Sequence, residues 1–492
     1  MGIFMDGVGA VWEIITFVLG GLFFFNLIFS VVIVFFERRD PKSVWAWLLL
    51  LFFLPGVGFI FYLFLGMDMH KHKMFREKEL ENDLHDIIRA QKNRLKKGGG
   101  VKNENLAGYT DLIMYNMETA DAVLLGDNDI DIFTDGNRKF DALIADLEKA
   151  EKFIHLQYYI IRNDVLFQRI AEVLKRKAAE GVTVRVLFDG MGCRKTRHSC
   201  WKQLEAAGVH TAEFFPAILG RLQLRINYRN HRKIVVIDNK VAYVGGFNIG
   251  REYIGLDERF GYWRDTHLRI RGAGAVGLQL RFILDWDYAA KEHLSKEEEW
   301  FEEAPAGERD HCDVQIISSG PDNSLQQIRD NYIKLIAKAK KRICIQTPYF
   351  IPDEAVLSTL LIAVRSGIEV NLMIPCKPDH PFVYWATYSY MGQLLNAGAN
   401  CYIYNNGFLH SKGIVLDGEV FCYGTANMDI RSFALNFEVN AVVYSREKAR
   451  EMERLFREDL KHCTRVTRES YSARSLKVRF KEQVCRLMSP LL

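Results

Sequence analysis

One pattern of polar residues that could act on a phosphate group occurs twice in the chain. Each copy has a histidine, a lysine two positions later, and then an aspartate, a glycine and an asparagine at matching intervals. The two copies consist of His231, Lys233, Asp238, Gly245, Gly246 and Asn248, and of His410, Lys412, Asp417, Gly424, Thr425 and Asn427. Chance produces the spacing from the histidine to the first glycine in roughly a few of a thousand such chains. Its repetition therefore indicates a shared function.

The residue types of the two motifs predict chemistry on a phosphate. His231 and Lys233 are two positions apart, so on a strand both side chains lie on one face, and the second motif has the same spacing. If the motifs face each other, the two lysines stabilise charge on the nonbridging oxygens. One imidazole can then attack phosphorus while the other protonates the leaving oxygen. This chemistry requires no metal, and the sequence has neither a cluster with metal-ligand spacing nor a Walker-type glycine loop.

The remaining motif residues are expected to shape the phosphate site. Glycines allow the backbone to pass close to a bound group, and asparagines can donate amide hydrogens to it. We assign phosphate binding to Asn248, Asn427, Gly245, Gly246, Gly424 and Thr425. Asp238 and Asp417 have odd spacing from the lysines and fall at expected hairpin turns around residues 239–240 and 418–419. Their spacing alone favours a structural role.

Two carboxylates in apolar, strand-like runs are candidates for orienting the histidines. A nucleophilic imidazole needs a carboxylate on its other ring nitrogen to hold one tautomer. Asp265 follows the first motif and Glu438 follows the second. We expect each to orient the histidine of its own motif, so that Asp265 binds His231 and Glu438 binds His410. The alternative is that each carboxylate lies on the surface of an edge strand.

The elements that must position these residues are themselves repeated. Phe153–Ile161 (FIHLQYYII) resembles Ile343–Ile351 (ICIQTPYFI), and the strand-like run GVTVRVLFDG resembles GIEVNLMIP farther along the chain. A helix-like stretch precedes the first strand of each copy, at residues 139–152 and 325–341. Strand, helix, strand and then a β-hairpin, found twice, predict an α/β fold of two similar halves.

The paired motifs resemble the two HKD motifs of the phospholipase D superfamily, and the chain resembles the bacterial cardiolipin synthases within it. The resemblance extends from about Ile14 to Leu492 and is carried by RRDPKSVWAWLL, NHRKI, QTPYFIP, HSKGIVLD and the terminal LMSPLL. It implies an α/β fold with two pseudo-twofold-related α/β/α lobes that share one active site. It also implies that the catalytic positions are His231, Lys233, Asp238, His410, Lys412 and Asp417.

The same resemblance implies the reaction and its partners. One phosphatidylglycerol would form a phosphatidyl-histidine and free glycerol, and a second phosphatidylglycerol would accept the phosphatidyl group to give cardiolipin. The family uses no organic cofactor, and its N-terminal motif is the implied nucleophile, which makes His231 the attacking residue and His410 the general acid and base. The alternative is a phospholipase D-type phosphodiesterase that uses water as the acceptor. An inactive scaffold protein is disfavoured because both histidines and both lysines are present. The sequence does not exclude phosphatidylethanolamine as the donor lipid.

Two uncharged runs near the N-terminus predict a two-helix transmembrane hairpin. Ile14–Phe36 and Val44–Leu65 each match the roughly 20 residues that cross a bilayer as a helix. The alternatives are buried core helices or a cleaved signal peptide, but residues 1–13 lack the lysine or arginine of a signal peptide. The expected divisions are a hairpin over 1–66, a juxtamembrane helix and linker over 67–125, and lobes over 126–300 and 301–492.

Composition and charge limit the partners and the location. The net charge of +4 at pH 7 disfavours the usual strongly basic binder of nucleic acid. Nine scattered cysteines without a CxxC pair suit reduced thiols, which favours a cytoplasmic catalytic domain. The family resemblance implies that the membrane is the bacterial inner membrane. The tail over residues 474–492 alternates basic and apolar residues, so it either lies on an anionic membrane surface or closes the second lobe. A homo-oligomer is left open.

Overall fold

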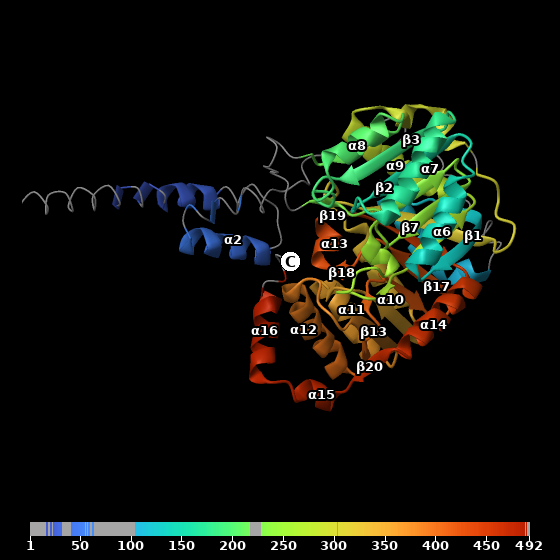
Figure 1. Cartoon of the computed structure of the whole chain (residues 1–492). Helices are drawn as coiled ribbons and strands as arrows, with labels where there is room; N and C mark the ends of the chain where they lie inside the picture. The colour runs from blue at the N-terminus through green and yellow to red at the C-terminus, as the bar shows by residue number, and fades with distance from the viewer. Residues whose placement is uncertain are drawn as a thin grey trace, which may run out of the picture. The chain divides into compact units, whose positions relative to one another are not determined.

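The computed structural model describes residues 16–17, 20–21, 23–31, 41–54, 56, 58–59, 62, 104–216, 228–302, 304–487 and 489 of the chain (Figure 1). The chain divides into two compact units, one made of Met1–His72 and Ala217–Asn227 and the other of Lys73–Pro216 and Tyr228–Leu492. Both motifs lie in the second unit, which therefore contains all the predicted site residues.

The first unit contains helix α2 (Pro41–Phe53). Trp47, Leu51 and Tyr62 form a small buried core there, and the Asn26 amide donates a 3.0 Å hydrogen bond to the Leu51 carbonyl. Within the described residues, no helix combines the length and the apolar character that crossing a membrane requires. The predicted spans include residues outside the described ones, so the hairpin stays a prediction. Residues 67–103 of the predicted juxtamembrane segment also lie outside the described residues.

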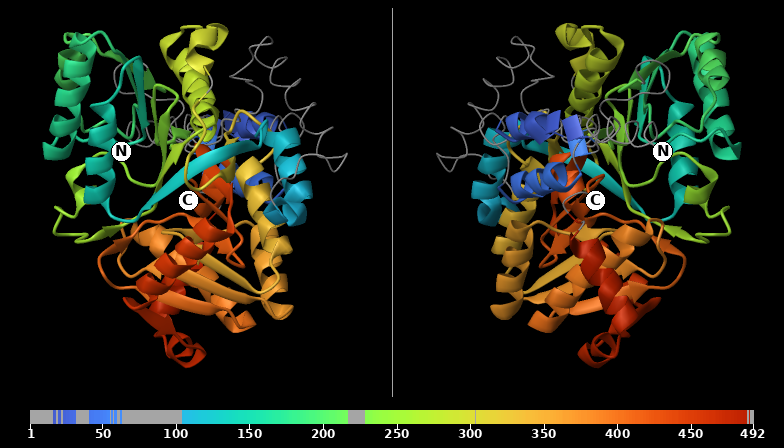
Figure 2. Two further views of the ribbon diagram at one scale, coloured as in Figure 1. Left: turned by 90° about the vertical axis from the view of Figure 1, so that its right-hand side faces the viewer. Right: turned by 90° about the vertical axis from the view of Figure 1, so that its left-hand side faces the viewer.

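The second unit consists of two α/β lobes, in which helices cover the strands of a shared sheet (Figures 1 and 2). The strands of the first lobe are β1 (Leu125–Phe133), β2 (Phe153–Tyr158), β3 (Thr183–Asp189), β4 (His210–Phe214), β5 (Arg229–Asn230), β6 (Ile234–Ile237), β7 (Val241–Gly245), β8 (Trp263–Arg264) and β9 (His267–Arg271). Its helices are α6 (Gly136–Leu147), α7 (Val165–Ala179), α8 (His198–Glu205) and α9 (Gly274–Ala290).

The second lobe repeats this plan and extends it. Its strands are β10 (Cys312–Ser319), β11 (Arg342–Gln346), β12 (Phe350–Ile351), β13 (Glu369–Pro375), β14 (Asn400–Tyr404), β15 (Phe408–Leu409), β16 (Gly413–Leu416), β17 (Val420–Gly424), β18 (Met428–Asp429), β19 (Asn436–Tyr444) and β20 (Cys463–Val466). Its helices are α10 (Gln327–Lys338), α11 (Glu354–Arg365), α12 (Pro381–Ala397), α13 (Ile430–Ala434), α14 (Arg446–Leu460), α15 (Arg468–Ser472) and α16 (Leu476–Leu487).

The sheet runs through both lobes in a mirrored order. β1 and β10 pair antiparallel in the middle, with β9-β7-β6-β2-β3-β4 on one side and β19-β17-β16-β11-β13-β14 on the other. β20 adds one further strand beyond β14. Buried aliphatic and aromatic side chains fill one core in each lobe. The predicted α/β repeat is confirmed, and the mirrored order brings both motif hairpins, β6-β7 and β16-β17, toward the shared middle.

Hydrogen-bond register corrects the predicted alignment of the repeat by one residue. β2 pairs Gln157 with Ile234, and β11 pairs Gln346 with Gly413. Since Ile234 and Gly413 occupy the same position in the two motifs, Gln157 is equivalent to Gln346. The predicted match of Phe153–Ile161 with Ile343–Ile351 is therefore shifted. Both faces of these strands are buried, so their apolar runs lack the alternation that would define a register.

Part of the predicted linker belongs to the core of the second lobe. Helix α5 (Thr110–Ala120) follows the short 3₁₀ helix η1 (Glu104–Tyr109) and buries Leu112, Ile113 and Met117 in the same cluster as Tyr332 of α10. The apolar residues recur at helical spacing, so one face of α5 is covered. Within the range 67–125, the described residues 104–120 thus act as an element of the lobe.

Candidate active site

Two short parallel pairings carry the histidines across the boundary between the lobes. β5, which directly precedes His231, pairs with the start of β19 in the second lobe, and the His231 N–H donates a 2.9 Å hydrogen bond to the Phe437 carbonyl. β15, which precedes His410, pairs with β8 in the first lobe, and the His410 N–H donates a 2.7 Å bond to the Arg264 carbonyl. Each motif is therefore anchored to the opposite lobe.

Because of these pairings, each histidine binds the carboxylate that follows the other motif. His231 Nδ1 lies 2.9 and 3.0 Å from the two carboxylate oxygens of Glu438, and His410 Nδ1 lies 2.6 Å from Asp265 Oδ2. The predicted pairing within each motif, Asp265 with His231 and Glu438 with His410, is wrong. One residue beyond the β5–β19 pairing the neighbour of His231 is Glu438, and one residue beyond β15–β8 the neighbour of His410 is Asp265.

Both lysines are buried beside the histidines of their own motifs. The Lys233 ammonium donates a 2.6 Å hydrogen bond to the His231 carbonyl, and Lys412 donates one of the same length to the His410 carbonyl. Lys412 Nζ also lies 3.8 Å from Asp265 Oδ2. Burial lowers the pKa of Lys412 to about 8 and that of Lys233 well below its ordinary value. A bound anion would favour the charged forms of both lysines and raise their pKa values.

Charge and burial set the state of the four acid–base groups. Burial lowers the pKa of His231 and of His410 to about 4, against the opposing pull of the carboxylates. Burial also opposes ionisation of Asp265 and Glu438, but the neighbouring lysine and histidine outweigh it and hold both pKa values below the ordinary range. Lys412 lowers the pKa of His231 as well, which places both motifs within one electrostatic site.

The glycine positions of the motifs make room for the carboxylates. A Cβ atom on Gly246 would lie 1.9 Å from Asp265 Oδ1, so only glycine fits opposite this carboxylate. At the equivalent position, the Thr425 hydroxyl instead donates a 2.5 Å hydrogen bond to Glu438 Oε2.

The N–H groups of this segment are already used within the sheet. Those of Gly246 and Thr425 donate to the Thr266 and Val439 carbonyls at 2.9 and 3.0 Å, and that of Gly424 points to the Lys412 carbonyl at 3.4 Å. Gly245 sits in the β7–β9 ladder opposite His267. Gly246 and Thr425 thus help to position Asp265 and Glu438. The phosphate-binding role of Gly245, Gly246, Gly424 and Thr425 stays a prediction.

The two motif asparagines differ in their surroundings. Asn248 Oδ1 accepts a 3.1 Å hydrogen bond from the Ile160 N–H, and its amide nitrogen donates to the Tyr253 hydroxyl, so it holds the loop after β2. Asn427 is buried, and its Oδ1 has no hydrogen-bond partner among the described residues. Asn427 thus stays a candidate for contact with a substrate, whereas the contacts of Asn248 are structural.

The motif aspartates fix hairpin turns at the far end of each motif strand. Asp238 accepts hydrogen bonds of 2.7–2.9 Å from the N–H groups of residues 151–153, and Asp417 accepts bonds of the same lengths from residues 340–342. Both turns are centred one residue earlier than predicted, at Asp238-Asn239 and Asp417-Gly418, where all four residues have positive φ. These contacts support the structural role that the spacing of the aspartates favours, and their implied catalytic role stays a prediction.

Comparisons with known proteins show the family to which the chain belongs. A family model described as "Cardiolipin synthase, PLD-like domain" matches residues 143–259 and 332–460, which include both motifs, and one described as "Phospholipase_D-nuclease N-terminal" matches residues 24–66. The cardiolipin synthase of Oceanobacillus iheyensis is 46% identical over 97% of this chain and 100% of that protein. The major cardiolipin synthase of Bacillus subtilis strain 168 is 47% identical over the same shares of each chain. The chain belongs to the bacterial cardiolipin synthases of the phospholipase D superfamily.

As a member of the cardiolipin synthases, the enzyme is a phosphatidyltransferase. The solved phosphatidylserine synthase of Haemophilus influenzae Rd KW20 has a TM-score of 0.57 and 14% sequence identity, covering 79% of this chain and 97% of that one. This likeness supports the two-lobed fold alone.

Residues that the sequence did not single out flank the two histidines of this synthase. The Trp263 ring lies 5.0 Å from the His410 ring, and the Tyr159 ring lies 5.0 Å from the His231 ring. The Asn436 amide donates a 3.2 Å hydrogen bond to Glu438 Oε1. Trp263 and Asn436 each stand two positions before an orienting carboxylate, and on a strand this spacing places them on the carboxylate's face. That spacing was the available signal.

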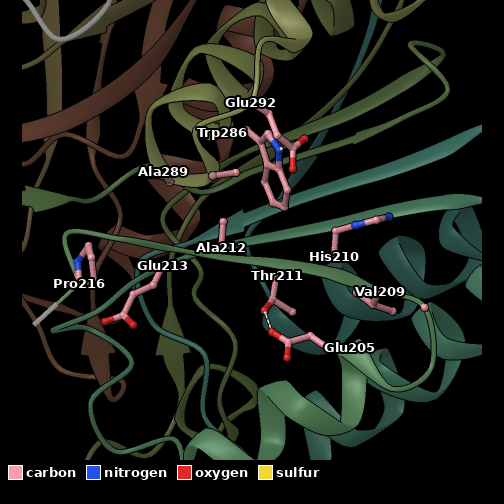
Figure 3. Close-up of a pocket in the computed structure, with 12 residues that line it drawn as sticks. Glu205, Val209, His210, Thr211, Ala212, Glu213, Pro216, Trp286, Ala289 and Glu292 are labelled. Atoms are coloured by element: carbon pink, nitrogen blue, oxygen red, sulfur yellow. Dashed lines mark hydrogen bonds between the residues drawn. The ribbon is translucent and has the colours of Figure 1, made fainter. Parts of the chain in front are cut away.

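A groove of about 590 Å³ lies elsewhere, along the edge strand β4 and the end of α9 (Figure 3). Trp286, Glu213 and Glu292 line it, and the Thr211 hydroxyl donates a 2.5 Å hydrogen bond to Glu205 there. No motif residue lines this groove. The described part of the chain also has no group of three or more histidine, cysteine or acidic side chains arranged to hold a metal ion. We therefore keep His231 and His410 as the candidate catalytic residues.

Proposed function

We propose that the enzyme transfers a phosphatidyl group from one phosphatidylglycerol to another and releases glycerol. The proposal rests on His231 and His410. The Nδ1 atom of each histidine lies against a buried carboxylate of the opposite lobe, and a lysine lies beside each histidine. With Nδ1 held, Nε2 of His231 is left for phosphorus. Nε2 of His410 lies 3.1 Å from Lys412 Nζ, and we assign to it the proton exchange with the leaving and entering oxygens. Two similar imidazoles suit a reaction in which the leaving and entering groups are both glycerol hydroxyls.

In the first step, His231 Nε2 attacks the phosphorus of the donor. The bond from phosphorus to the headgroup glycerol oxygen breaks, and His410 gives this oxygen a proton. The products are a phosphatidyl-histidine on His231 and free glycerol. Lys233 and Lys412 stabilise the charge that develops on the nonbridging oxygens, and Asn427 is the candidate for a further contact with the headgroup.

In the second step, a hydroxyl of the second phosphatidylglycerol gives its proton to His410 and attacks the same phosphorus. The bond between phosphorus and His231 Nε2 breaks, cardiolipin forms, and both histidines return to their starting states. His410 thus acts first as the general acid and then as the general base.

The protonation states of the free enzyme fit this sequence once the anionic substrate is bound. Both histidines have a pKa lowered by burial to about 4, so both are neutral at pH 7 and His231 is ready to attack. A phosphodiester anion between them favours the charged imidazole and raises its pKa, which prepares His410 to act as an acid. The orienting carboxylate Asp265 stabilises the imidazolium that results.

The substrates lie in a membrane, and we place the enzyme at the bacterial cell membrane with a cytoplasmic catalytic unit. The apolar runs Ile14–Phe36 and Val44–Leu65 support a multi-pass anchor. Resistance of the full chain to carbonate extraction is the expected result. Complete solubility of a fully active chain would contradict the anchor.

The reaction is tested with purified full-length enzyme and phosphatidylglycerol labelled in the headgroup glycerol and, separately, in an acyl chain. We expect equal amounts of cardiolipin and free glycerol on thin-layer analysis. Phosphatidic acid as the only lipid product would point to hydrolysis and overturn the proposal. Labelled phosphatidylethanolamine in a parallel reaction shows whether it replaces phosphatidylglycerol as the donor.

A further inference from the structure

Helix α16 is the last helix of the described chain (Figure 1). It carries a row of exposed apolar side chains. Leu476, Phe480, Val484 and Leu487 are 81%, 71%, 36% and 82% exposed. Their spacing of four, four and three residues places all of them on one stripe of the helix. Single exposed apolar residues are common on proteins, but a contiguous row marks an interaction surface.

The opposite face of α16 attaches the helix firmly to the second lobe. Glu482 and Cys485 are buried there, and α16 packs along α12. The Arg474 guanidinium donates hydrogen bonds of 2.7 and 3.0 Å to the Glu482 carboxylate. The helix is therefore already formed and held, and its apolar stripe faces away from the lobe.

Basic side chains border the apolar stripe on both sides. At about 100° per residue, Lys477 and Lys481 lie on one side of the stripe, and Arg479 and Arg486 lie on the other. The Lys481 ammonium is 5.2 Å from the Trp385 ring and the Arg486 guanidinium is 5.4 Å from the Tyr390 ring, so these two cations stand where α16 meets α12. Glu482, the one acidic residue of α16, is on the buried face. An apolar stripe between two rows of cations is the pattern of helices that lie in the interface of an anionic bilayer.

We propose that α16 docks the catalytic unit onto an anionic lipid surface. Leu476, Phe480, Val484 and Leu487 enter the boundary between headgroups and acyl chains, and the flanking lysines and arginines bind the lipid phosphates. The sequence left two roles open for the tail at 474–492, and α16 fulfils both, since one face closes the second lobe and the other faces the membrane. This docking is separate from the predicted N-terminal anchor and from the chemistry of the site.

The proposal is tested by photocrosslinking in the full-length enzyme reconstituted into vesicles with an anionic lipid content of about one third. Phe480→p-benzoylphenylalanine places a photoreactive ring in the stripe. The matched control is Val165→p-benzoylphenylalanine at the start of α7, where a single apolar residue is 57% exposed. Figure 1 shows α7 and α16 far apart within the unit. We expect lipid adducts at position 480 at a yield at least about tenfold above that at position 165, a contrast of the size that burial of one aromatic side chain provides.

Two further observations decide between a membrane and a protein partner. Replacing the anionic lipid by a zwitterionic one, or raising the salt concentration, should reduce the adducts at position 480, because the basic rows lose their counter-charges. The double variant Phe480→Ser/Leu487→Ser should lower turnover in vesicles relative to detergent micelles by on the order of tenfold. Adducts to a second copy or another protein in place of lipid, or equal lipid yields at both positions, would overturn the proposal. Since crosslinking needs no turnover, its result is independent of the proposed reaction.

Discussion

The half of the active site around His231 and the half around His410 share one pairing, of a histidine with a carboxylate, but differ in the groups that surround it. Lys412 lies 2.7 and 3.1 Å from the two ring nitrogens of His410, whereas Lys233 donates to the His231 carbonyl. In both halves, a histidine from one lobe binds a carboxylate from the other. The shorter carboxylate, Asp265, lies against Gly246, where no side chain fits. The longer one, Glu438, accepts a hydrogen bond from the Thr425 hydroxyl. The strand pairings between the lobes thus determine which carboxylate each histidine binds. Local packing determines how firmly each carboxylate is held.

The flanks of the two halves differ in polarity. Beside His410, the equivalent register positions hold Trp263 and Phe408, whose rings are 4.9 Å apart. Beside His231, they hold Asn436 and Arg229, both buried. A pseudo-twofold site would give both histidines the same environment, but these pairs break the symmetry. This difference permits the two imidazoles to take different parts in one reaction.

Removing the histidines should produce the largest effect and the sharpest contrast between the halves. The substrate is a phosphatidyl ester with p-nitrophenol as the leaving group, which departs without a general acid. His410→Ala should give a burst of nitrophenol and a lipid adduct on His231, while both variants lose cardiolipin synthesis by about 10⁴-fold or more. His231→Ala should give neither burst nor adduct. Mass spectrometry locates the adduct, and an adduct on His410 in the intact enzyme would reverse the two roles.

The lysines are expected to matter in both halves alike. Lys233→Met and Lys412→Met remove a buried cation beside the phosphate and should each lower kcat by about a hundredfold. Methionine has a similar length and suits the buried positions, so the thermal unfolding temperature should not fall. Steady-state assays with phosphatidylglycerol measure the loss, and a variant with wild-type turnover would show that its lysine does not contact the phosphate.

The sequence predicted which residues form the site better than it predicted which of them contact one another. His231, Lys233, His410 and Lys412 could be found because spacing and residue type repeat together. The partners of the histidines could not, because the two-residue strand β5 pairs with a segment about two hundred residues away and has no local signal. A pairing of this kind depends on the packing of whole lobes, which short-range patterns do not contain.

Other differences have local causes. The register of β2 and β11 was shifted because both faces of these strands are buried and carry no alternation. Gly246 was interpreted as a neighbour of phosphate, although its small size serves the side chain of Asp265. Glycine records that something comes close to the backbone, but the sequence does not say whether this is a ligand or another part of the chain.

Gly246 and Thr425 test whether the two carboxylates are held differently. In Gly246→Ala, the new Cβ would lie 1.9 Å from Asp265 Oδ1, so Asp265 and His410 must move. We expect kcat to fall by tens of fold, since small misplacements of a catalytic group are costly. Thr425→Ala removes one hydrogen bond to Glu438 and should lower kcat by about fivefold, while Thr425→Ser keeps the hydroxyl and serves as the control. Equal losses in Gly246→Ala and Thr425→Ala would contradict the different supports.

The buried Lys412 should limit activity at alkaline pH. Its pKa is lowered by burial to about 8, and only the charged form stabilises the phosphate oxygens. Activity should therefore be present below pH 8, fall a few fold within roughly half a pH unit above it, and continue to fall toward the activity expected of Lys412→Met. Lys412→Arg keeps its charge at all accessible pH values and should remove this step from the kcat/KM profile. A step unchanged in Lys412→Arg would assign it to another group, of which Lys233 is the first candidate.

The motif aspartates should show the smallest effect on turnover and an equal effect on both lobes. Asp238 and Asp417 each accept three backbone hydrogen bonds at a turn, at the opposite end of the motif strand from the histidine. Asn tolerates the positive φ of these positions but has a single acceptor oxygen, so Asp238→Asn and Asp417→Asn should each lower the free energy of unfolding by about 1–3 kcal/mol. Thermal unfolding measures this change, and kcat of the folded fraction should stay within about twofold of the wild-type value. A hundredfold loss of kcat without a change in unfolding temperature would support the implied catalytic role of these aspartates. A loss of stability in one variant alone would show that the two turns, despite their matching hydrogen bonds, support their lobes unequally.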